Sequence, residues 1–255
     1  MAGEPMILAA KDVQKAFGGI RAVDGCTLSV SPRSITALIG PNGAGKSTFF
    51  NILAGLYRPD GGEIWFNNVR VDGLPPYELV RLGLIKTWQI PHELKNLTVL
   101  ENLVLAAKAN SGEHLINLFV RPRLVRKDEK RWRARAREVL ALTQLDGLAH
   151  EHAKSLSGGQ KKLLELARAL MADPTLVLLD EPVAGVNPTL AGSLMDLIAK
   201  LRADGKTFFL IEHDMNVVMN RCDRVIVMHQ GRKIAEGTPA AVKADPVVIE
   251  SYLGG

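Results

Sequence analysis

The sequence predicts an α/β fold whose centre is a parallel β-sheet. Between residues 159 and 228, strand-sized apolar runs alternate with segments of helical periodicity, the pattern of a parallel sheet covered by helices. Earlier in the chain, a glycine-rich stretch separates an apolar strand, Ser34–Ile39, from a predicted helix, Lys46–Leu56. These two observations predict the fold class, and the individual elements follow in chain order.

The first eighty residues predict short β-strands around that helix. The expected strands are Ile7–Ala10, Ala22–Val30, Ser34–Ile39 and Glu63–Asn67, the last after the turn Asp60-Gly61-Gly62. Pro75-Pro76 opens a mostly helical region, in which Leu97–Ala109 and Lys127–Leu142 show the clearest helical period. We therefore expect a helical subdomain over about residues 81–155, inserted into a core formed by residues 1–80 and 156–240 that includes an N-terminal antiparallel β subdomain.

The second half supplies the alternating elements. The expected helices are Gly159–Met171, Pro188–Arg202 and a short one after Ile211, and the expected strands are Leu176–Leu179, Thr207–Ile211 and Arg224–Met228. A turn-rich stretch, Gly231–Gly237, precedes a helical tail over about residues 241–255 that includes Pro246–Leu253. No motif repeats, so residues 1–255 are expected to form a single functional domain.

Composition narrows the class of protein. The chain has 255 residues, 47% hydrophobic and 23% charged, which excludes a disordered or fibrous protein. Cys26 and Cys222 lie far apart without metal-ligand partners, so we expect no disulfide or zinc framework and a reducing cytosol. The longest apolar stretches are strand-sized, well below the roughly 20 residues of a membrane span. The first ten residues do not resemble a signal peptide, so any membrane role is expected to be peripheral.

The positive charge is concentrated in one segment. Residues 121–137 contain nine Lys or Arg and two acidic residues, a net charge of +7, whereas the whole chain carries +5. Such a stripe can bind nucleic acid or anionic lipid, or it can be a solvated helix face. The sequence leaves its role open, and no nucleic-acid partner is predicted.

Gly40-Pro41-Asn42-Gly43-Ala44-Gly45-Lys46-Ser47-Thr48 matches the pattern G-x-x-x-x-G-K-[ST]. The stretch lies directly after an apolar strand and directly before a helix, the context that this phosphate-binding loop requires. Its glycines let successive backbone N–H groups point inward, toward a phosphate at the positive end of the helix. Lys46 is expected to reach the β- and γ-phosphates of a nucleotide, and Ser47 to offer its hydroxyl to Mg²⁺.

An acidic pair ends the buried-type strand Leu176–Leu179. Asp180 and Glu181 are expected at the sheet edge where ligands of open α/β sheets bind. Taken alone, such a pair commonly caps a strand. Beside a phosphate-binding loop, Asp180 is expected to hold Mg²⁺, and Glu181 to polarise the water that attacks the γ-phosphate.

A third motif brings a family resemblance. Leu156-Ser157-Gly158-Gly159-Gln160 starts a predicted helix about twenty residues before the acidic pair, and a serine with glycines at a helix start is a second anion-binding arrangement. The chain resembles the ATP-binding-cassette (ABC) ATPases, a group of P-loop NTPases, because all three motifs occur in that family's order and spacing. The resemblance implies that Ser157, Gly158 and Gly159 form the family's signature motif.

Further site residues follow from the resemblance. Gln89 resembles the Q-loop glutamine that contacts Mg²⁺ and the attacking water, and His213 resembles the switch histidine that contacts the γ-phosphate. Phe17 resembles the aromatic residue that stacks on adenine. Read alone, Gln89 carries no signal and His213 is a surface residue at a strand end, while a core position is the competing interpretation for Phe17. Asn187 stands where the family's D-loop usually has aspartate, which leaves its contribution open.

The resemblance also implies partners. In the family, two cassettes pair head to tail, so that the signature of one covers the nucleotide held by the other. ATP and Mg²⁺ are the implied cofactors, and the second ATPase subunit is another copy or a paralogue. Membrane permease subunits and, indirectly, a periplasmic solute-binding protein are the other implied partners, with the chain at the cytoplasmic face of the inner membrane.

Within the family, the chain is most similar to the ATPases of bacterial uptake systems for branched-chain and other hydrophobic amino acids. The similar segments are Lys15–Val23, Glu181–Pro188, Ile211–Met219, Ile234–Pro239 and Val248–Gly254. Cassettes for urea or short amides, for lipopolysaccharide export, and soluble ABC ATPases outside transport remain alternatives. The permease is expected to dock over about Leu82–Ala109, whose apolar residues can equally be the core of the helical subdomain.

Overall fold

The computed structural model describes residues 6–87, 93–107 and 122–253. For residues 122–125, 252 and 253 it describes the backbone alone. The chain divides into two compact units. The first contains Met1–Gln89, Thr175–Pro182 and Ile198–Gly255, and the second contains Ile90–Pro174 and Val183–Leu197. Each unit is described by itself.

A six-stranded sheet forms the centre of the first unit. In sheet order its strands are β10 (Arg232–Gly237), β9 (Arg224–His229), β3 (Ile35–Ile39), β8 (Thr207–Ile211), β7 (Leu176–Asp180) and β6 (Leu84–Lys86). All neighbours pair in parallel except β10, which runs antiparallel to β9 at the edge. Every residue of β3, β7 and β8 is buried, which explains why their sequences are continuous apolar runs. The sheet confirms the predicted parallel core.

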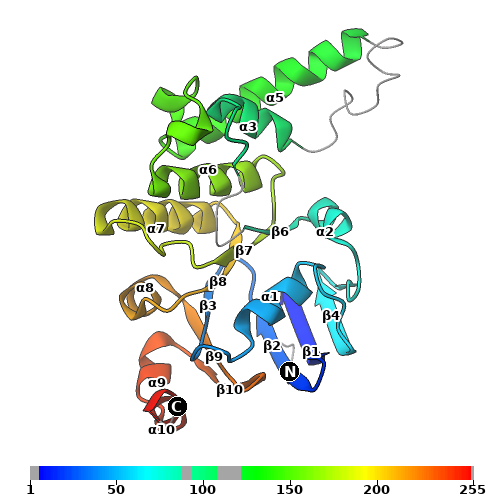
Figure 1. Ribbon diagram of the computed structural model, residues 1–255, viewed down its shortest axis with the longest axis vertical. Coiled ribbons are helices and arrows are strands. Elements are labelled where there is room, and N and C mark those ends of the chain that lie inside the picture. The colour runs from blue at the N-terminus through cyan, green and yellow to red at the C-terminus, as the bar shows by residue number, and fades with distance from the viewer. Residues whose placement is uncertain (1–5, 88–92, 108–121, 254–255) are drawn as a thin grey trace. The chain divides into compact units, whose positions relative to one another are not determined.

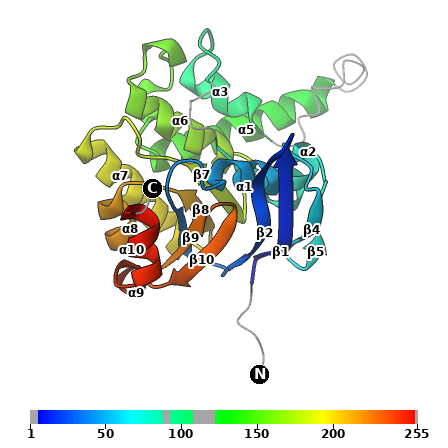
Figure 2. The same cartoon turned by 60° about the horizontal axis from the view of Figure 1, so that its bottom comes forward.

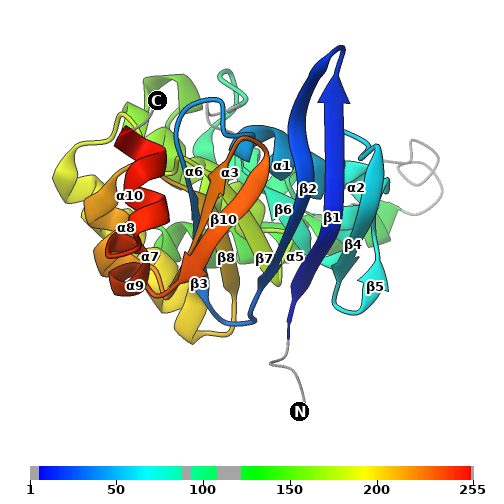
Figure 3. The same cartoon turned by 90° about the horizontal axis from the view of Figure 1, so that it is seen from below.

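A second, antiparallel sheet belongs to the same unit. Its order is β2 (Ile20–Val30), β1 (Leu8–Phe17), β4 (Gly61–Phe66) and β5 (Val69–Arg70). Figure 3 shows the strands of the two sheets, with the long β1–β2 hairpin in blue. The hairpin closes where Phe17 pairs with Ile20. This sheet is the predicted N-terminal β subdomain.

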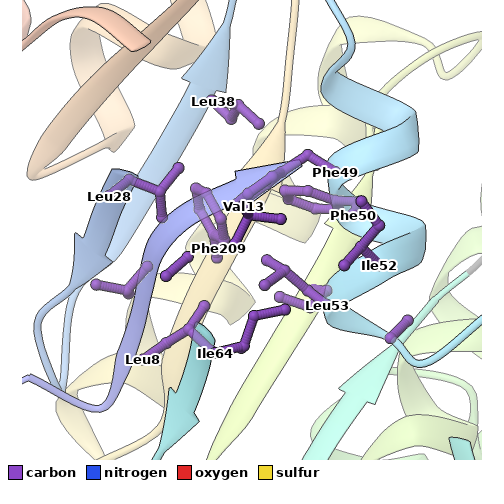
Figure 4. Packing of buried hydrophobic residues seen from close by; sticks show 14 of the residues in the cluster. Leu8, Val13, Leu28, Leu38, Phe49, Phe50, Ile52, Leu53, Ile64 and Phe209 are labelled. Carbon is purple, nitrogen blue, oxygen red and sulfur yellow. The ribbon is translucent and has the colours of Figure 1, made fainter. Parts of the chain in front are cut away.

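Helix α1 (Lys46–Leu53) packs into the apolar core that the two sheets share. Phe49 and Phe50 are fully buried, and the ring centroid of Phe50 lies 4.8 Å from that of Phe209 on β8. Figure 4 shows these rings beside Leu8 and Ile64 from the antiparallel sheet. Burying a residue of this size contributes about 1.5–3 kcal/mol, so the core holds α1, and the loop before it, firmly in place. Helix α2 (Pro76–Leu82) adds the buried Leu79.

Three short helices complete the first unit. They are α8 (Met215–Arg221), α9 (Pro239–Lys243) and α10 (Pro246–Leu253), and Figure 2 shows α9 and α10 in orange and red near β9 and β10. Asp214 caps α8 through the N–H groups of Asn216 and Val217, and Thr238 caps α9.

The second unit is helical. It contains α3 (Val99–Leu105), α5 (Pro122–Leu142), α6 (Gly158–Leu170), two 3₁₀ turns (Asp146–Leu148 and Ala153–Ser155) and the start of α7 (Pro188–Ala203). Figure 1 shows α3, α5 and α6 together in green. Val99, Leu100 and Leu103 of α3 are buried, and a capping box between Thr98 and Glu101 starts the helix. Within the described residues, no helix has the length and apolarity needed to cross a membrane.

Several predicted boundaries are wrong. The stretch 231–237, predicted as turns, is strand β10 after a tight turn at Gly231, and its mixed polar sequence reflects an edge strand with no fully buried residue. Strand β6 lies inside the region predicted to be helical, because three residues are too few to show a period. The predicted helix 46–56 ends at Leu53 because Gly55 adopts a φ of 73°. Of the predicted helix 97–109, residues 108 and 109 lie outside the described part.

Candidate nucleotide-binding and hydrolysis site

The glycine-rich loop connects β3 to α1, and two of its glycines are required by the backbone that surrounds it. Gly45 has a φ of 96°, and a Cβ there would lie 2.1 Å from the carbonyl oxygen of Ala22. A Cβ on Gly40 would lie 2.0 Å from the carbonyl oxygen of Met228. The carbonyl of Ala44 accepts from the N–H of Gly231, 3.0 Å away. The loop is therefore held by β2, β9 and the β9–β10 turn.

Lys46 lies over this loop. Its Nζ donates to the carbonyl oxygens of Gly40 and Pro41, at 2.8 and 2.9 Å, which leaves one of three N–H bonds for a ligand. Burial lowers the pKa of Lys46, while the Glu181 and Asp180 carboxylates act in the opposite direction. Ser47 is exposed and Thr48 is half-buried in the first turn of α1, where backbone N–H groups have no intrahelical acceptor. The loop thus presents N–H donors and one ammonium group, the chemistry that binds phosphates.

The acidic pair lies at the end of β7: Asp180 is the last residue of the strand, and Glu181 follows it. Asp180 is buried, 6% exposed, and pairs with Ile211 of β8. Glu181 has a φ of 50°, a left-handed conformation unusual for glutamate, and its N–H donates to the carbonyl of Ile211 at 3.0 Å. Such backbone conformations cost about 1–3 kcal/mol and occur preferentially at functional sites. The conformation turns the Glu181 side chain away from the direction that a continued strand would give it.

The structure brings Glu181 and His213 together. Glu181 Oε1 lies 3.4 Å from His213 Nδ1, and the imidazole side chain is 64% exposed. Glu212, 1% exposed, accepts through Oε2 from the N–H groups of His213 and Asp214, at 3.2 and 3.4 Å. Asp214 in turn caps α8. These hydrogen bonds fix the backbone at His213, while its ring lies beside Glu181 and is exposed enough to contact a ligand. Glu212 is not among the site residues predicted from the sequence.

The side chains near the loop fit a magnesium ion. Ser47 offers a hydroxyl and Asp180 a carboxylate, both hard oxygen ligands. Among the described residues, no three His, Cys, Asp or Glu side chains cluster as a metal site. Mg²⁺ commonly binds through one or two protein oxygens plus phosphates and water, so this donor set matches a metal that arrives with a nucleotide. A cation already faces Asp180 in the structure, since Lys86 Nζ lies 3.2 Å from Oδ2.

Phe17 ends β1 with 44% of its surface exposed, so it is not a core residue. The ring of Tyr57 meets it edge-on, with centroids 5.3 Å apart. Asp60 fixes the two residues before Phe17: its carboxylate accepts hydrogen bonds from Lys15 Nζ and from the N–H of Ala16, each at 2.7 Å. An exposed, braced aromatic face of this kind suits stacking on a base. From the sequence, Asp60 is predicted only as a turn residue.

The signature residues begin α6 in the second unit. Ser157 and Gln160 form a capping box, in which Ser157 Oγ accepts from the N–H of Gln160 at 3.3 Å. A Cβ on Gly158 would meet no heavy atom within 4 Å, whereas a Cβ on Gly159 would lie 2.1 Å from Leu190 Cδ2. Gly159 is thus needed for packing, and Gly158 leaves an open surface.

Two further predicted residues have different outcomes. Gln89 lies outside the described residues. Asn187, the departure from the usual D-loop, caps α7: its Oδ1 accepts from the N–H of Leu190 at 2.9 Å. Asparagine and aspartate are equally good caps, so the substitution keeps this local bond.

A parallel sheet with a phosphate-binding loop after one strand and a carboxylate pair after another defines a nucleotide-binding cassette of the P-loop class. The chain belongs to the ABC transporter family: the family model described as ABC transporter matches residues 23–184. A second model, described as branched-chain amino acid ATP-binding cassette transporter, matches residues 232–255.

Similar proteins agree with this assignment. The chain is 41% identical over 248 residues to the probable branched-chain amino acid transport ATP-binding protein LivG of Archaeoglobus fulgidus, which covers 97% of this chain and 95% of the relative. It is 40% identical over 250 residues to the high-affinity branched-chain amino acid transport ATP-binding protein BraF of Pseudomonas aeruginosa, covering 97% and 98%.

Solved structures match along the same length. A nucleotide-free ATP-binding cassette from an ABC transporter aligns with a TM-score of 0.85 at 39% identity, covering 98% of this chain and 100% of that one. A dimeric cassette in a post-hydrolysis state, bound to ADP and Pi, aligns with a TM-score of 0.75 at 29% identity, covering 91% and 98%. The predicted fold and family are confirmed.

Proposed function

We propose that this chain is the ATP-binding and ATP-hydrolysing subunit of a bacterial importer for branched-chain or other hydrophobic amino acids. The geometry of the first unit carries the proposal: Lys46 over the glycine-rich loop, buried Asp180 at a strand end, and Glu181 3.4 Å from His213. The cargo class is supported by relatives named for branched-chain amino acid transport and by the match at residues 232–255.

Each residue has a defined task in hydrolysis. Lys46 and the first N–H groups of α1 balance the charge of the β- and γ-phosphates. Glu181 orients the attacking water and accepts its proton, as the water oxygen bonds to the γ-phosphorus and the bond to the bridging oxygen of ADP breaks. His213 holds the Glu181 carboxylate and contacts the γ-phosphate. Ser47 and Asp180, with Gln89 contributing, would hold a Mg²⁺ ion that would screen the phosphate charge.

A second cassette completes the site. Gly158 and the capped Ser157 present an open helix start, the kind of surface that binds an anion supplied by another chain. The dimeric cassette at 29% identity supports a pair of cassettes, formed with another copy or a paralogue. A head-to-tail arrangement of that pair would bring Ser157 and Gly158 of one chain to the nucleotide of the other. Permease subunits would couple this pair to the membrane, and a periplasmic binding protein would deliver the cargo.

The substitution Glu181→Gln tests the hydrolytic part. The amide keeps the shape of the carboxylate but accepts no proton, so we expect ATP turnover to fall by at least about 100-fold while ATP still binds. Turnover and binding of a fluorescent ATP analogue are measured on the dimeric protein. Glu250→Gln, an exposed position on α10, is the matched control and should behave as wild type. Undiminished turnover of the Glu181→Gln protein would remove Glu181 from this role.

The cargo requires a separate experiment, because the ATPase does not touch it. The cassette is reconstituted in vesicles with candidate permease subunits and a candidate solute-binding protein. Stimulation of ATPase activity by leucine, isoleucine or valine supports the proposal. Stimulation by urea or short amides, activity in lipopolysaccharide export, or full activity without any permease would assign the chain to one of the alternatives instead.

Within the predicted docking range, fewer apolar residues are exposed for contact with a permease than the sequence alone suggests. Most apolar residues of α3 are buried in the second unit, so they belong to its core. Leu82, Leu94 and Leu105 are exposed, at 40%, 39% and 60%, and are the candidates for contact with a permease within the described part of the docking region.

The basic helix α5 is proposed to face the anionic inner leaflet. Arg126, Lys130, Arg133 and Arg137 recur at i, i+4, i+7 and i+11, so they share one helix face about 16 Å long, and all are exposed. Glu129 pairs with Arg133, at 2.8 Å, which leaves the stripe strongly positive. Each Lys or Arg near such a leaflet contributes about 1 kcal/mol.

Vesicle flotation tests this orientation. The triple variant Arg126→Glu, Lys130→Glu, Arg137→Glu should bind phosphatidylglycerol vesicles at least about 100-fold more weakly than wild type. The control reverses three exposed lysines elsewhere, Lys11, Lys154 and Lys243. Equal recovery of the triple variant and wild type would reject the proposal, as would a loss confined to binding of nucleic acid.

A further inference from the structure

A buried lysine faces the carboxylate that is expected to hold Mg²⁺. Lys86 is the last residue of β6, and its side chain is 8% exposed. Its Nζ lies 3.2 Å from Asp180 Oδ2, and the side chain of Asp180 is also 8% exposed. The same Nζ donates to Asn51 Oδ1 at 2.7 Å. Neither Lys86 nor Asn51 is among the site residues predicted from the sequence.

Lys86 joins two parts of the site. Asp180 ends β7, and Asn51 lies on α1, the helix that follows the phosphate-binding loop. Asn51 is four residues after Ser47, so both are on the same face of that helix. The ammonium group therefore contacts the carboxylate expected to bind the metal and the helix face that carries the hydroxyl expected to bind it.

The charges explain why a lysine is there. A buried carboxylate without a counter-ion is strongly unfavourable, and the Coulomb attraction of a close cation offsets that cost. Mg²⁺ is also a cation, so it competes with Lys86 for Asp180 and is repelled by the ammonium group. Phosphates bring additional negative charge and tip this balance toward the metal.

We propose that Lys86 is a positioning residue that acts as the counter-ion of Asp180 in the nucleotide-free protein. It keeps the carboxylate in place and lowers the affinity of the site for free Mg²⁺, so that the metal binds only together with a nucleotide. This inference rests on the proposed function, which makes Asp180 a metal ligand.

Binding of Mg²⁺ alone is the direct readout. Melting temperatures of the full chain are measured in EDTA and in rising MgCl₂ without nucleotide. The wild-type melting temperature should hardly respond. The Lys86→Met protein should melt about 10 °C lower in EDTA, because Asp180 loses its counter-ion, and should regain much of that loss in Mg²⁺. Lys86→Arg keeps the charge, so its melting temperature should respond to Mg²⁺ as little as that of wild type, whatever its value in EDTA.

Nucleotide affinity gives an independent readout. The ratio of ATP affinity in Mg²⁺ to ATP affinity in EDTA should rise by about tenfold in Lys86→Met, since the metal no longer competes with a fixed cation. The same Mg²⁺ response in Lys86→Met and wild type, in both assays, would overturn the proposal.

A double variant protects the test against simple misfolding. Lys86→Met with Asp180→Asn removes both charges, and it should melt well above Lys86→Met in EDTA. If it melts no higher, the loss comes from the contact with Asn51 and the counter-ion role is wrong. The single variant Asp180→Asn tests the proposed metal-binding role of Asp180 separately from the role of Lys86. If Mg²⁺ raises the ATP affinity of Asp180→Asn as much as that of wild type, Asp180 is not a metal ligand, and that part of the proposed function is wrong.

Discussion

The substitution Gly158→Ala is expected to impair the dimeric ATPase without destabilising the folded chain. Gly158 is the first residue of α6, and a Cβ there would meet nothing within 4 Å. Alanine is favoured over glycine within a helix by about 0.5–1 kcal/mol, so the free energy of unfolding of Gly158→Ala should stay equal or rise slightly. In the proposed dimer this surface approaches the nucleotide of the partner. ATPase activity should therefore fall at least about tenfold, equivalent to about 1.4 kcal/mol.

The neighbouring residue is the control for this experiment. A Cβ on Gly159 would lie 2.1 Å from Leu190 Cδ2 and 3.2 Å from Val186 Cγ1, so both side chains must move. Overpacking of this kind costs about 1–3 kcal/mol, and the Gly159→Ala protein should unfold at lower urea concentration. Urea unfolding and ATPase activity are measured for both variants. A Gly158→Ala protein with wild-type turnover would show that Gly158 does not lie against a partner's nucleotide.

Two further substitutions test local contacts. Asn187→Ala removes the cap on α7 and should lower the free energy of unfolding by about 1 kcal/mol, whereas Asn187→Asp should leave it unchanged; equal urea midpoints for all three proteins would contradict the cap. Hydrogen bonds from Lys15 and from the Ala16 N–H lower the pKa of Asp60, so its contribution is present above the unfolded pKa of about 4 and is lost as the pH falls through the folded value. The stability difference between wild type and Asp60→Asn should therefore shrink as the pH falls below about 4, and a difference independent of pH would refute the role of this carboxylate.

The positions in the fold of the motifs with local sequence patterns could be predicted from the sequence. The loop 40–48, the acidic pair and His213 each follow a buried strand, and a run of apolar residues is sufficient to locate such a strand. The carboxyl ends of parallel strands meet at one sheet edge, which explains why the structure places Glu181 and His213 3.4 Å apart, although the sequence predicted each residue separately. Their catalytic roles stay predictions.

The contacts between distant segments could not be predicted. Lys86 ends a strand of only three residues and meets Asn51 and Asp180 from two other elements, a combination without a spacing signature. Asp60 has the sequence context of a turn, and nothing local indicates its bond to Lys15. The edge strand β10 has a mixed polar sequence that resembles a loop. In each case the tertiary structure determines the contact or the strand, and the local sequence propensity does not indicate it.

Crosslinking tests the claim on which the proposed function depends, that one chain cannot complete its own site. Ser47→Cys and Ser157→Cys are introduced together with Glu181→Gln, which blocks hydrolysis, and the protein is oxidised in ATP and Mg²⁺. Cys26 and Cys222 give little background, because both are buried and burial raises the pKa of each thiol to about 12. A disulfide between chains that forms only with nucleotide is the expected result. Absence of any such bond, with the cognate second subunit also present, would contradict the account.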